Sequence, residues 1–240
     1  MTARRGERGA AMVMAMMAVL FMTALGGALM LTALSETIIA GGFRAAEGTR
    51  YAAEAAAERV LADLAVADDW NLFLAGLARS SFVDGAPAGT RAIPDGTTID
   101  LGQQVNLANC QKTTACSIAE MNASTSDRPW GVNNPRWTLL AYAPLNALLP
   151  NTSLDASFYA VVLAGDDPAE TDNDPTQDGS DPANPGSGII VLRATAFGPR
   201  GAVRAIELTV SRPAGQDGAG DYNDRARQRG VRVLSWNEVR

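Results

Sequence analysis

The sequence contains no histidine and only two cysteines, and each shortage argues against a class of site. Histidine is the commonest general base and a common zinc ligand, so its absence removes every Ser-His and Cys-His nucleophile pair. The two cysteines, Cys110 and Cys116, are too few for a four-cysteine zinc site or for a scaffold held by several disulfides. Most hydrolase mechanisms and structural zinc sites are therefore not expected.

Basic residues are also in the minority. The chain has 20 Lys and Arg against 26 Asp and Glu, which gives a formal net charge of −6. Proteins that hold DNA or RNA present a basic surface to the phosphates, so no nucleic-acid partner is expected. No phosphate-binding P-loop, GxSxG elbow or dinucleotide-binding glycine motif occurs, and no pair of carboxylates is singled out as acid and base. The sequence therefore does not favour an enzyme.

Charge is missing altogether between Gly9 and Ser35. The apolar run within this segment, Ala10–Leu34, has 25 residues. As a helix it is about 37 Å long, enough to cross a hydrocarbon core of roughly 30 Å. The residues before it carry three Arg against one Glu, and this bias places the N-terminus in the cytoplasm. The sequence thus predicts a single membrane span with the rest of the chain outside the cytoplasm.

Two export signals are alternatives to a permanent span. A cleavable secretory signal has an apolar region of only ~7–15 residues, shorter than this run. The Arg4-Arg5 pair is a feature of twin-arginine signals, but nothing else of that signal follows the pair. The length of the apolar run favours the membrane span over both.

The helix is expected to continue past the membrane. No proline occurs between Ala10 and Ala86, and alanine, glutamate and arginine are abundant after the apolar run. These features predict one long helix over residues 10–66, with residues 10–34 in the membrane. The second half is amphipathic, and its predicted apolar stripe comprises Phe43, Ala46, Tyr51, Ala55, Leu61 and Leu64. Such a stripe needs a surface that covers it.

Two glycine pairs interrupt the helical composition. Gly26-Gly27 lies in the middle of the apolar run, and Gly41-Gly42 lies just beyond it. Each pair costs roughly 2 kcal/mol of helix propensity relative to alanine, which predicts kinks. The alternative is that small residues allow helices to approach closely in lipid. Either interpretation implies partners in the membrane.

The order of these segments resembles a known family. The basic leader that ends at Arg8-Gly9, the apolar stretch that opens at Ala10 and the long helix after it resemble the class III signal of type IV pilins and secretion pseudopilins. Within that group, residues 35–44 (SETIIAGGFR) and 51–55 (YAAEA) are similar to the N-terminal region of PilX-like pilus assembly proteins. Residues 231–239 (VRVLSWNEV) resemble the way that family ends, and no motif lies between.

The resemblance implies how the chain is processed and what it contacts. A prepilin peptidase would remove the leader, residues 1–9, by cutting after Gly9, and the new N-terminus at Ala10 would be methylated. The partners implied are other pilins and minor pilins, bound through the N-terminal helix, and the assembly platform of the inner membrane. The chain would then reach the pilus or the cell surface.

One position departs from the pattern of major pilins. Major pilins usually carry a glutamate as the fifth residue of the mature chain, and this chain has Met14 there. A carboxylate among apolar helices is costly unless it pairs with a cation, which in that family is a neighbouring subunit's N-terminal ammonium. Met14 cannot form this pair. The resemblance therefore implies a minor pilin, for example at the filament tip, rather than the bulk subunit.

Residues 67–240 are expected to form an extracytoplasmic α+β head domain. Residues 68–80 predict a short helix capped by Asp68 or Asp69, with Trp70, Phe73, Leu74 and Leu77 facing inward. Turn residues border a candidate strand near Thr97–Leu101. The clearest strands are short, rich in β-branched and aromatic residues, and separated by turns: Arg136–Ala143, Ser157–Leu163, Gly188–Phe197 and Ala202–Ser211, with residues 231–236 (VRVLSW) as a fifth. They predict an antiparallel sheet that covers the stripe on the long helix.

Cys110 and Cys116 enclose five residues. In an oxidising compartment outside the cytoplasmic membrane, this spacing favours a small disulfide loop. A thiol redox motif would have two residues between its cysteines, at the start of a helix. The spacing in this chain does not fit that motif.

The segment Gly165–Gly188 is strongly acidic, and no basic residue occurs from Trp137 through Leu192. Calcium is the natural counter-ion for carboxylates in such a loop, although the register of the twelve-residue calcium loop is not met. The residues chosen for a calcium site are Asp172, Asp174 and Asp178. The alternatives are a solvated loop or a surface for a basic partner. The carboxylates of the segment are Asp166, Asp167, Glu170, Asp172, Asp174, Asp178 and Asp181.

The sequence therefore predicts an α+β, pilin-like fold in which a long membrane-spanning helix packs on a small antiparallel sheet. The function expected is that of a structural minor pilin, which assembles by packing of its helix and requires no cofactor. The alternative is a single-span anchored protein whose acidic loop binds calcium or a basic partner. The two differ in whether the chain is cut at Gly9.

Overall fold

A computed structural model describes residues 7–93, 96–148, 157–179, 186–213 and 230–239. The chain divides into two compact units, Met1–Arg44 and Ala45–Arg240. The boundary falls inside the first helix, α1 (Glu7–Val66), which is continuous through both glycine pairs. The predicted kinks at Gly26-Gly27 and Gly41-Gly42 are therefore wrong. Of the predicted leader, residues 1–6 lie outside the described residues.

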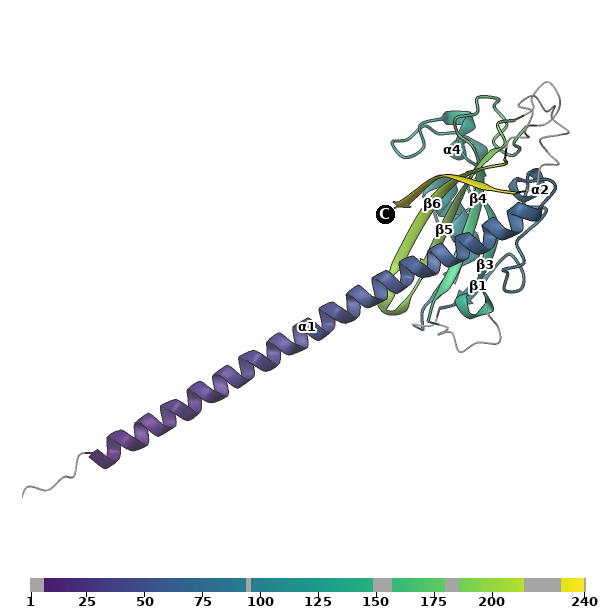
Figure 1. The fold of residues 1–240 in the computed structure, drawn as a ribbon. Coiled ribbons are helices and arrows are strands. Elements are labelled where there is room, and N and C mark those ends of the chain that lie inside the picture. Colours follow the sequence, from purple (N-terminus) through teal and green to yellow (C-terminus); the bar gives the residue numbers. More distant parts are fainter. Residues whose placement is uncertain (1–6, 94–95, 149–156, 180–185, 214–229, 240) are drawn as a thin grey trace, which may run out of the picture. The chain divides into compact units, whose positions relative to one another are not determined.

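The second unit is an α+β domain (Figure 1). Five strands form one antiparallel sheet in chain order, and two short strands form a separate hairpin. The sheet strands are β3 (Thr138–Pro144), β4 (Tyr159–Asp166), β5 (Ile189–Phe197), β6 (Val203–Ser211) and β7 (Arg232–Val239). The other elements are α2 (Asn71–Leu74), β1 (Thr90–Ala92), β2 (Thr98–Asp100), α3 (Leu101–Cys110), α4 (Ile118–Met121) and the 3-10 turns η1 (Gly131–Asn133), η2 (Leu145–Leu148) and η3 (Pro199–Gly201). The predicted antiparallel sheet and each of its strands are confirmed.

Small side chains line the contact between α1 and the sheet. On α1 the buried residues recur at helical spacing and are mostly alanine, including Ala52, Ala53, Ala56 and Ala57. The facing positions of the sheet include Ala141 and Ala143 of β3, Ala160 and Ala164 of β4, and Ala194 and Ala196 of β5. Alanine on both surfaces lets the helix backbone lie close to the strands, and the larger Val60, Leu61 and Leu64 fill the core near the helix end.

The apolar stripe predicted for this part of α1 is largely wrong. Leu61 and Leu64 are buried, but Phe43 and Tyr51 are 66% and 58% exposed, and Ala46 and Ala55 are only partly buried. The prediction ranked positions by hydrophobicity, whereas the sheet selects for small side chains. Tyr51 instead lies beneath the Arg50 guanidinium, whose Cζ is 4.6 Å from the ring centroid.

Glycine permits the closest approach between α1 and the β5–β6 hairpin. A Cβ built on Gly198 would lie 2.2 Å from Oγ1 of Thr49 on α1, and one built on Gly48 would lie 2.8 Å from the Phe158 ring. A larger side chain at Gly198 would force the helix and the hairpin apart, and one at Gly48 would clash with the Phe158 ring, which lies just before β4. The predicted turn at residues 198–201 thus also serves as a contact for the helix.

The opposite face of the sheet is covered as well. Alternate residues of β4 and β5 pack there against α3 and the β1–β2 hairpin; the buried set includes Leu101, Trp137, Tyr159, Val161, Leu163 and Val191. Asn109 of α3 fixes this layer, since its amide donates to the Trp137 carbonyl and accepts from the Trp137 N–H, both at 2.9 Å. The sequence did not predict α3.

The outer edge of β3 is paired with residues 80–84. Ser80 and Asp84 donate their N–H groups to Leu140 and Tyr142, and Tyr142 donates to Phe82. A sheet edge left open is a template for aggregation, so this segment protects β3. Asp63 of α1 anchors the segment by accepting hydrogen bonds from the Ser80 hydroxyl and the Ser81 N–H, at 2.5 and 2.9 Å.

The short helix after α1 differs from its prediction. It spans only Asn71–Leu74, because Gly76 adopts a positive φ of 69° and the Leu77 and Ala78 N–H groups close back onto the Leu72 carbonyl. Trp70, Phe73 and Leu74 are buried as expected, but Leu77 is 76% exposed. The inward orientation predicted for Leu77 is therefore wrong.

The alanine contact generates a stability prediction. Replacing the fully buried Ala56 with leucine forces extra atoms between α1 and the sheet, and overpacking of this kind costs about 1–3 kcal/mol. The matched control is Ala62→Leu, which changes an exposed position of the same helix and should alter the free energy of unfolding by less than about 0.5 kcal/mol. Urea-induced unfolding of the full chain in detergent micelles measures both. Equal values for the two variants would contradict the close contact.

Candidate functional site

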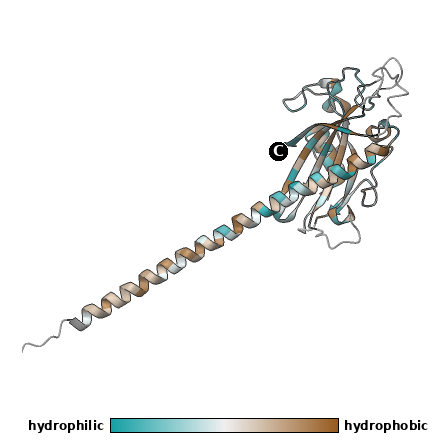
Figure 2. Cartoon of the chain, in the orientation of Figure 1, coloured by the Kyte–Doolittle hydropathy of each residue, from teal (hydrophilic) through white to brown (hydrophobic). Residues whose placement is uncertain are grey.

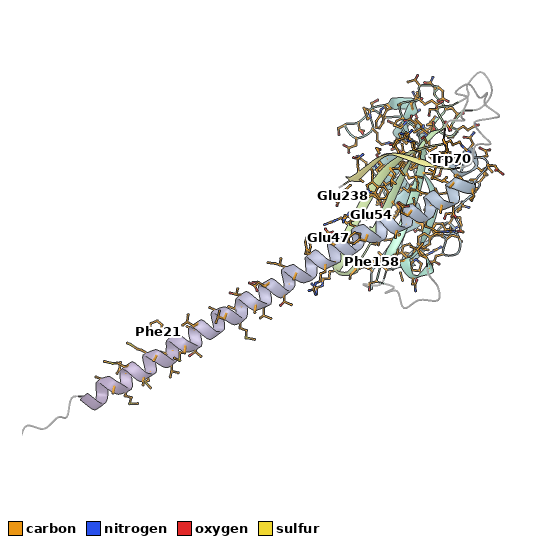
Figure 3. All side chains as sticks on the ribbon, in the orientation of Figure 1. Phe21, Glu47, Glu54, Trp70, Phe158 and Glu238 are labelled. Carbon is orange, nitrogen blue, oxygen red and sulfur yellow. A yellow bond between two sulfur atoms is a disulfide. The ribbon has the colours of Figure 1, made fainter. Side chains whose placement is uncertain are left out.

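The first unit presents an apolar helical surface. Every residue from Gly9 to Ala40 is exposed, and Figure 2 shows that this part of α1 is predominantly hydrophobic. Phe21 points outward from the helix in Figure 3 and is 69% exposed. α1 is long and apolar enough to cross a membrane. A helix of this kind requires lipid or other apolar helices around it.

The hydroxyl groups of this segment are satisfied within the helix. The hydroxyls of Thr23, Thr32 and Thr37 donate to the carbonyls four residues earlier, and the Ser35 hydroxyl donates to the Thr32 carbonyl. An unsatisfied polar group in hydrocarbon costs several kcal/mol, so internal bonding of this kind suits lipid.

The predicted assembly and cleavage residues all lie on this helix. Gly9 and Ala10 are in its first turns, and Met14 is 69% exposed. A Cβ added to Gly26 or Gly27 would meet no atom of the described chain, so the pair forms a low point on the helix surface. This arrangement agrees with the alternative that small residues permit close helix approach.

A cluster of carboxylates lies at the end of β4. Asp166 is the last residue of that strand, and Glu170 and Asp178 belong to the loop that leads to β5. One oxygen from each of the three side chains lies within 4.8 Å of the others. Asp166 is only 3% exposed, and its Oδ1 has no hydrogen-bond partner among the described residues.

Burial and mutual repulsion make it unfavourable for all three carboxylates to be ionised at once. Burial, followed by the charges of Asp178 and Glu170, raises the pKa of Asp166 to about 9. Burial also raises the pKa of Glu170 and that of Asp178. Backbone N–H groups oppose these shifts: Ser187 donates to Glu170 Oε2 at 3.2 Å, and Gly188 donates to Asp178 Oδ1 at 2.8 Å. These hydrogen bonds hold Glu170 and Asp178 beside Asp166 despite the repulsion between the three acidic groups.

The loop that carries the cluster is fixed to the helix after α1. Asn71 of α2 accepts a hydrogen bond from the Asp178 N–H at 2.7 Å and donates its amide to the Gly179 carbonyl at 3.0 Å. The Asn173 N–H donates to Asn133 Oδ1 of η1 at 2.9 Å. The carboxylates are thus positioned by contacts with two distant parts of the chain.

Of the three aspartates predicted for calcium, Asp178 is in the cluster, and Asp172 lies close enough for its charge to raise the pKa of Asp166 and that of Glu170. Asp172 and Asp174 form local turns, in which they accept the N–H groups of Asp174 and Thr176. Sequence reasoning missed Asp166 and Glu170 as partners of Asp178. Both were part of the acidic segment, but their convergence depends on the path of the loop back to β5. Asp181 lies outside the described residues.

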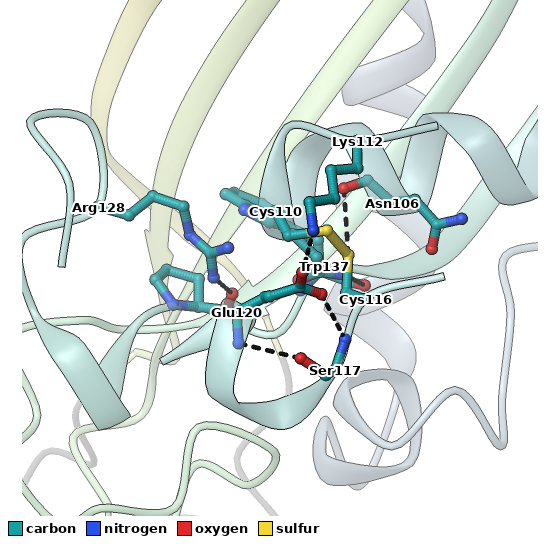
Figure 4. The surroundings of a disulfide bond; sticks show 10 residues. Asn106, Cys110, Lys112, Cys116, Ser117, Glu120, Arg128 and Trp137 are labelled. Atoms are coloured by element: carbon teal, nitrogen blue, oxygen red, sulfur yellow. Dashed lines mark hydrogen bonds and ion pairs between the residues drawn. A yellow bond between two sulfur atoms is a disulfide. The ribbon is translucent and has the colours of Figure 1, made fainter. Parts of the chain in front are cut away.

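Cys110 and Cys116 form a disulfide, as predicted (Figure 4). Cys110 ends α3, and Cys116 precedes α4, which begins with a capping box between Ser117 and Glu120. Lys112 in the enclosed loop forms an ion pair with Glu120. The bond therefore links α3 to the start of α4 on the layer that covers the sheet.

A cavity of about 510 Å³ lies over the side of the sheet that faces away from α1. Arg193 pairs there with Glu207 at 2.8 Å and stacks over the Trp137 ring at 4.8 Å. Arg128 lines the same space, and burial lowers the pKa of its guanidinium to about 10. Asp127 and Glu207 offset the two arginines, so the lining does not select a ligand of one charge. This cavity was not predictable from the sequence, because its walls come from distant segments: α3, residues 127–137 and three strands.

Comparisons with known proteins add no relative: no protein-family model matches the chain, and neither the curated proteins nor the solved structures contain a significant match. The description of this chain therefore comes from its own sequence and structure. It is an α+β chain with one long apolar N-terminal helix, an antiparallel sheet and a disulfide.

The disulfide should contribute measurably to stability. Closing so short a loop restricts the unfolded chain by about 2 kcal/mol in the chain-entropy model. We expect a reductant to lower the free energy of urea unfolding of the full chain by this amount, and to leave a Cys110→Ser, Cys116→Ser double variant unchanged. The chain has no other cysteine, so reduction reports on this bond alone. No effect of the reductant on the wild-type chain would contradict the prediction.

Proposed function

We propose that this chain is a PilX-like minor pilin, a structural subunit that assembles into or primes a type IV pilus through α1. The observation that carries the proposal is the continuity of α1. Its first part offers an apolar surface from Gly9 to Ala40, and the same helix continues without a break into the alanine-lined part that packs on the sheet. A subunit of a helical filament needs an apolar helix for assembly and a folded domain attached directly to it.

The proposed route begins in the inner membrane. The chain spans it once with the N-terminus in the cytoplasm and the α+β unit in the periplasm, and it then moves into the pilus or to the cell surface. Its partners are prepilin peptidase, the assembly platform and the helices of other pilins. The disulfide supports a location outside the cytoplasm, because disulfides form in the oxidising extracytoplasmic space and thiols are kept reduced in the cytoplasm.

Met14 supports a minor rather than a major subunit. Its thioether side chain, on an apolar and exposed part of α1, cannot pair with an ammonium group in the way that a glutamate does. A subunit without this charge pair is suited to a position where no neighbour requires it. The proposed place is at the tip or in the priming complex.

A second candidate function is that of an anchored extracytoplasmic protein that never enters a filament. The observation that favours it is the carboxylate cluster of Asp166, Glu170 and Asp178, which would give the α+β unit a binding role of its own. Such a protein would keep its N-terminal residues, because an anchor gains nothing from losing them.

Processing at Gly9 distinguishes the two functions. The full-length chain is produced with and without a prepilin peptidase, and its N-terminus is read by intact-mass and terminal-peptide mass spectrometry. The proposal predicts a peptidase-dependent product that begins at methylated Ala10.

The control is Gly9→Val, which places a branched side chain at the cleavage position. We expect this variant to retain Met1 even when the peptidase is active. If the wild-type chain also retains its leader in the presence of active peptidase, the pilin proposal fails and the anchored protein remains.

A further inference from the structure

We propose that Asp166, Glu170 and Asp178 form a calcium site at the junction of β4 with the acidic loop. The first observation is geometric. Three carboxylate oxygens, one from each residue, lie within 4.8 Å of one another. Two oxygens bound to the same calcium ion at roughly 2.3–2.6 Å can be no more than about 5 Å apart, so this spacing is compatible with one shared ion.

The second observation is the burial of Asp166. Only 3% of the Asp166 surface is exposed, and its Oδ1 atom has no hydrogen-bond partner among the described residues. A buried polar atom without a partner destabilises the fold, and more so when it is charged. A cation held between the three side chains would supply the missing partner.

One basic group, Arg212, lies near the cluster, and its charge opposes the rise in the pKa of Asp178. No basic residue occurs in the sequence from Trp137 through Leu192, which includes β4 and the whole loop. Three carboxylates without nitrogen or sulfur ligands suit a hard cation. Calcium accepts the irregular geometry of a loop and takes six to eight oxygens, so water would complete its coordination, whereas magnesium demands a near-ideal octahedron at shorter distances.

The ion would fix the loop to the sheet. Asp166 belongs to β4, Glu170 and Asp178 belong to the loop, and Asp178 is already bonded to Gly188 just before β5 and to Asn71 of α2. Calcium at this point would tie both ends of the loop to the same place. The inference does not depend on the proposed pilin function, because it concerns the α+β unit alone.

The test is calcium-dependent stability of the full-length chain. The protein is purified in detergent, stripped with a chelator, and its thermal midpoint is measured with and without calcium. For a site with a Kd of about 0.1 mM, typical of extracellular modules, about 10 mM Ca²⁺ should raise the midpoint by roughly 5–10 °C. Calorimetric titration with Ca²⁺ should give one ion per chain, and Mg²⁺ at the same concentration should give a smaller shift.

Three variants identify the ligands. Asp166→Asn removes the buried charge at constant shape, so it should abolish the calcium shift while leaving the midpoint in chelator unchanged or higher. Glu170→Gln gives a second test at a less buried position, where the amide oxygen can still accept the Ser187 N–H. Asp174→Asn is the matched control, because it removes a charge from the same loop but outside the cluster, and it should keep the full calcium shift.

Two results would overturn the inference. One is a wild-type chain whose midpoint does not change with calcium and which takes up no ion by calorimetry. The other is a calcium shift that Asp174→Asn abolishes and that Asp166→Asn and Glu170→Gln preserve, since the ion would then bind elsewhere on the acidic loop. Neither result bears on cleavage at Gly9, so failure here is distinct from failure of the proposed function.

Discussion

The rest of the structure depends on the contact between the small residues of α1 and the face of the sheet that packs against this helix. Because alanine lines both surfaces, the helix backbone lies close to the strands and buries only a narrow stripe. Gly198 extends this close approach to the β5–β6 hairpin, and Gly48 leaves room for the Phe158 ring. Phe73 and Leu74 of α2, together with Phe82, complete the core on that face, whereas α3 and the β1–β2 hairpin pack on the opposite face. The disulfide and the cavity both belong to that second layer.

This contact also explains how one helix can serve two environments. Residues 45–64 pack on the sheet mostly through small side chains, whereas the residues from Gly9 to Ala40 are predominantly apolar and satisfy their hydroxyls internally. A single helix thus passes from a segment suited to hydrocarbon to a segment suited to a β-sheet without a break in its hydrogen bonds. The proposed function depends on this division, because a filament subunit must present the first segment to its neighbours and keep the second for its own fold.

The strands were predictable because β-branched runs bounded by turns specify them locally; the hairpin at residues 198–201 is an example. The long helix was predictable from composition, because a long uncharged run without proline also specifies its structure locally. The buried face of α1 was not, since hydrophobicity pointed to Phe43 and Tyr51 while packing selected alanine. The extent of α2 was missed because Gly76 ends it with a positive φ. The acidic segment was evident from the sequence, but the convergence of Asp166 with Glu170 and Asp178 depends on the end of β4 and on Asn71, which lies 107 positions from Asp178.

The most direct test of the account is what the apolar surface of α1 contacts in the cell. A photo-crosslinking amino acid is placed at Phe21 of the full-length chain, in cells that assemble filaments, and the adducts from membranes and sheared filaments are identified by mass spectrometry. The same amino acid at the exposed Leu77 of the α+β unit is the control. The account predicts adducts of Phe21, but not of Leu77, with the N-terminal helix of another pilin. Adducts with lipid alone, while other subunits of the same cells crosslink to one another, would contradict it.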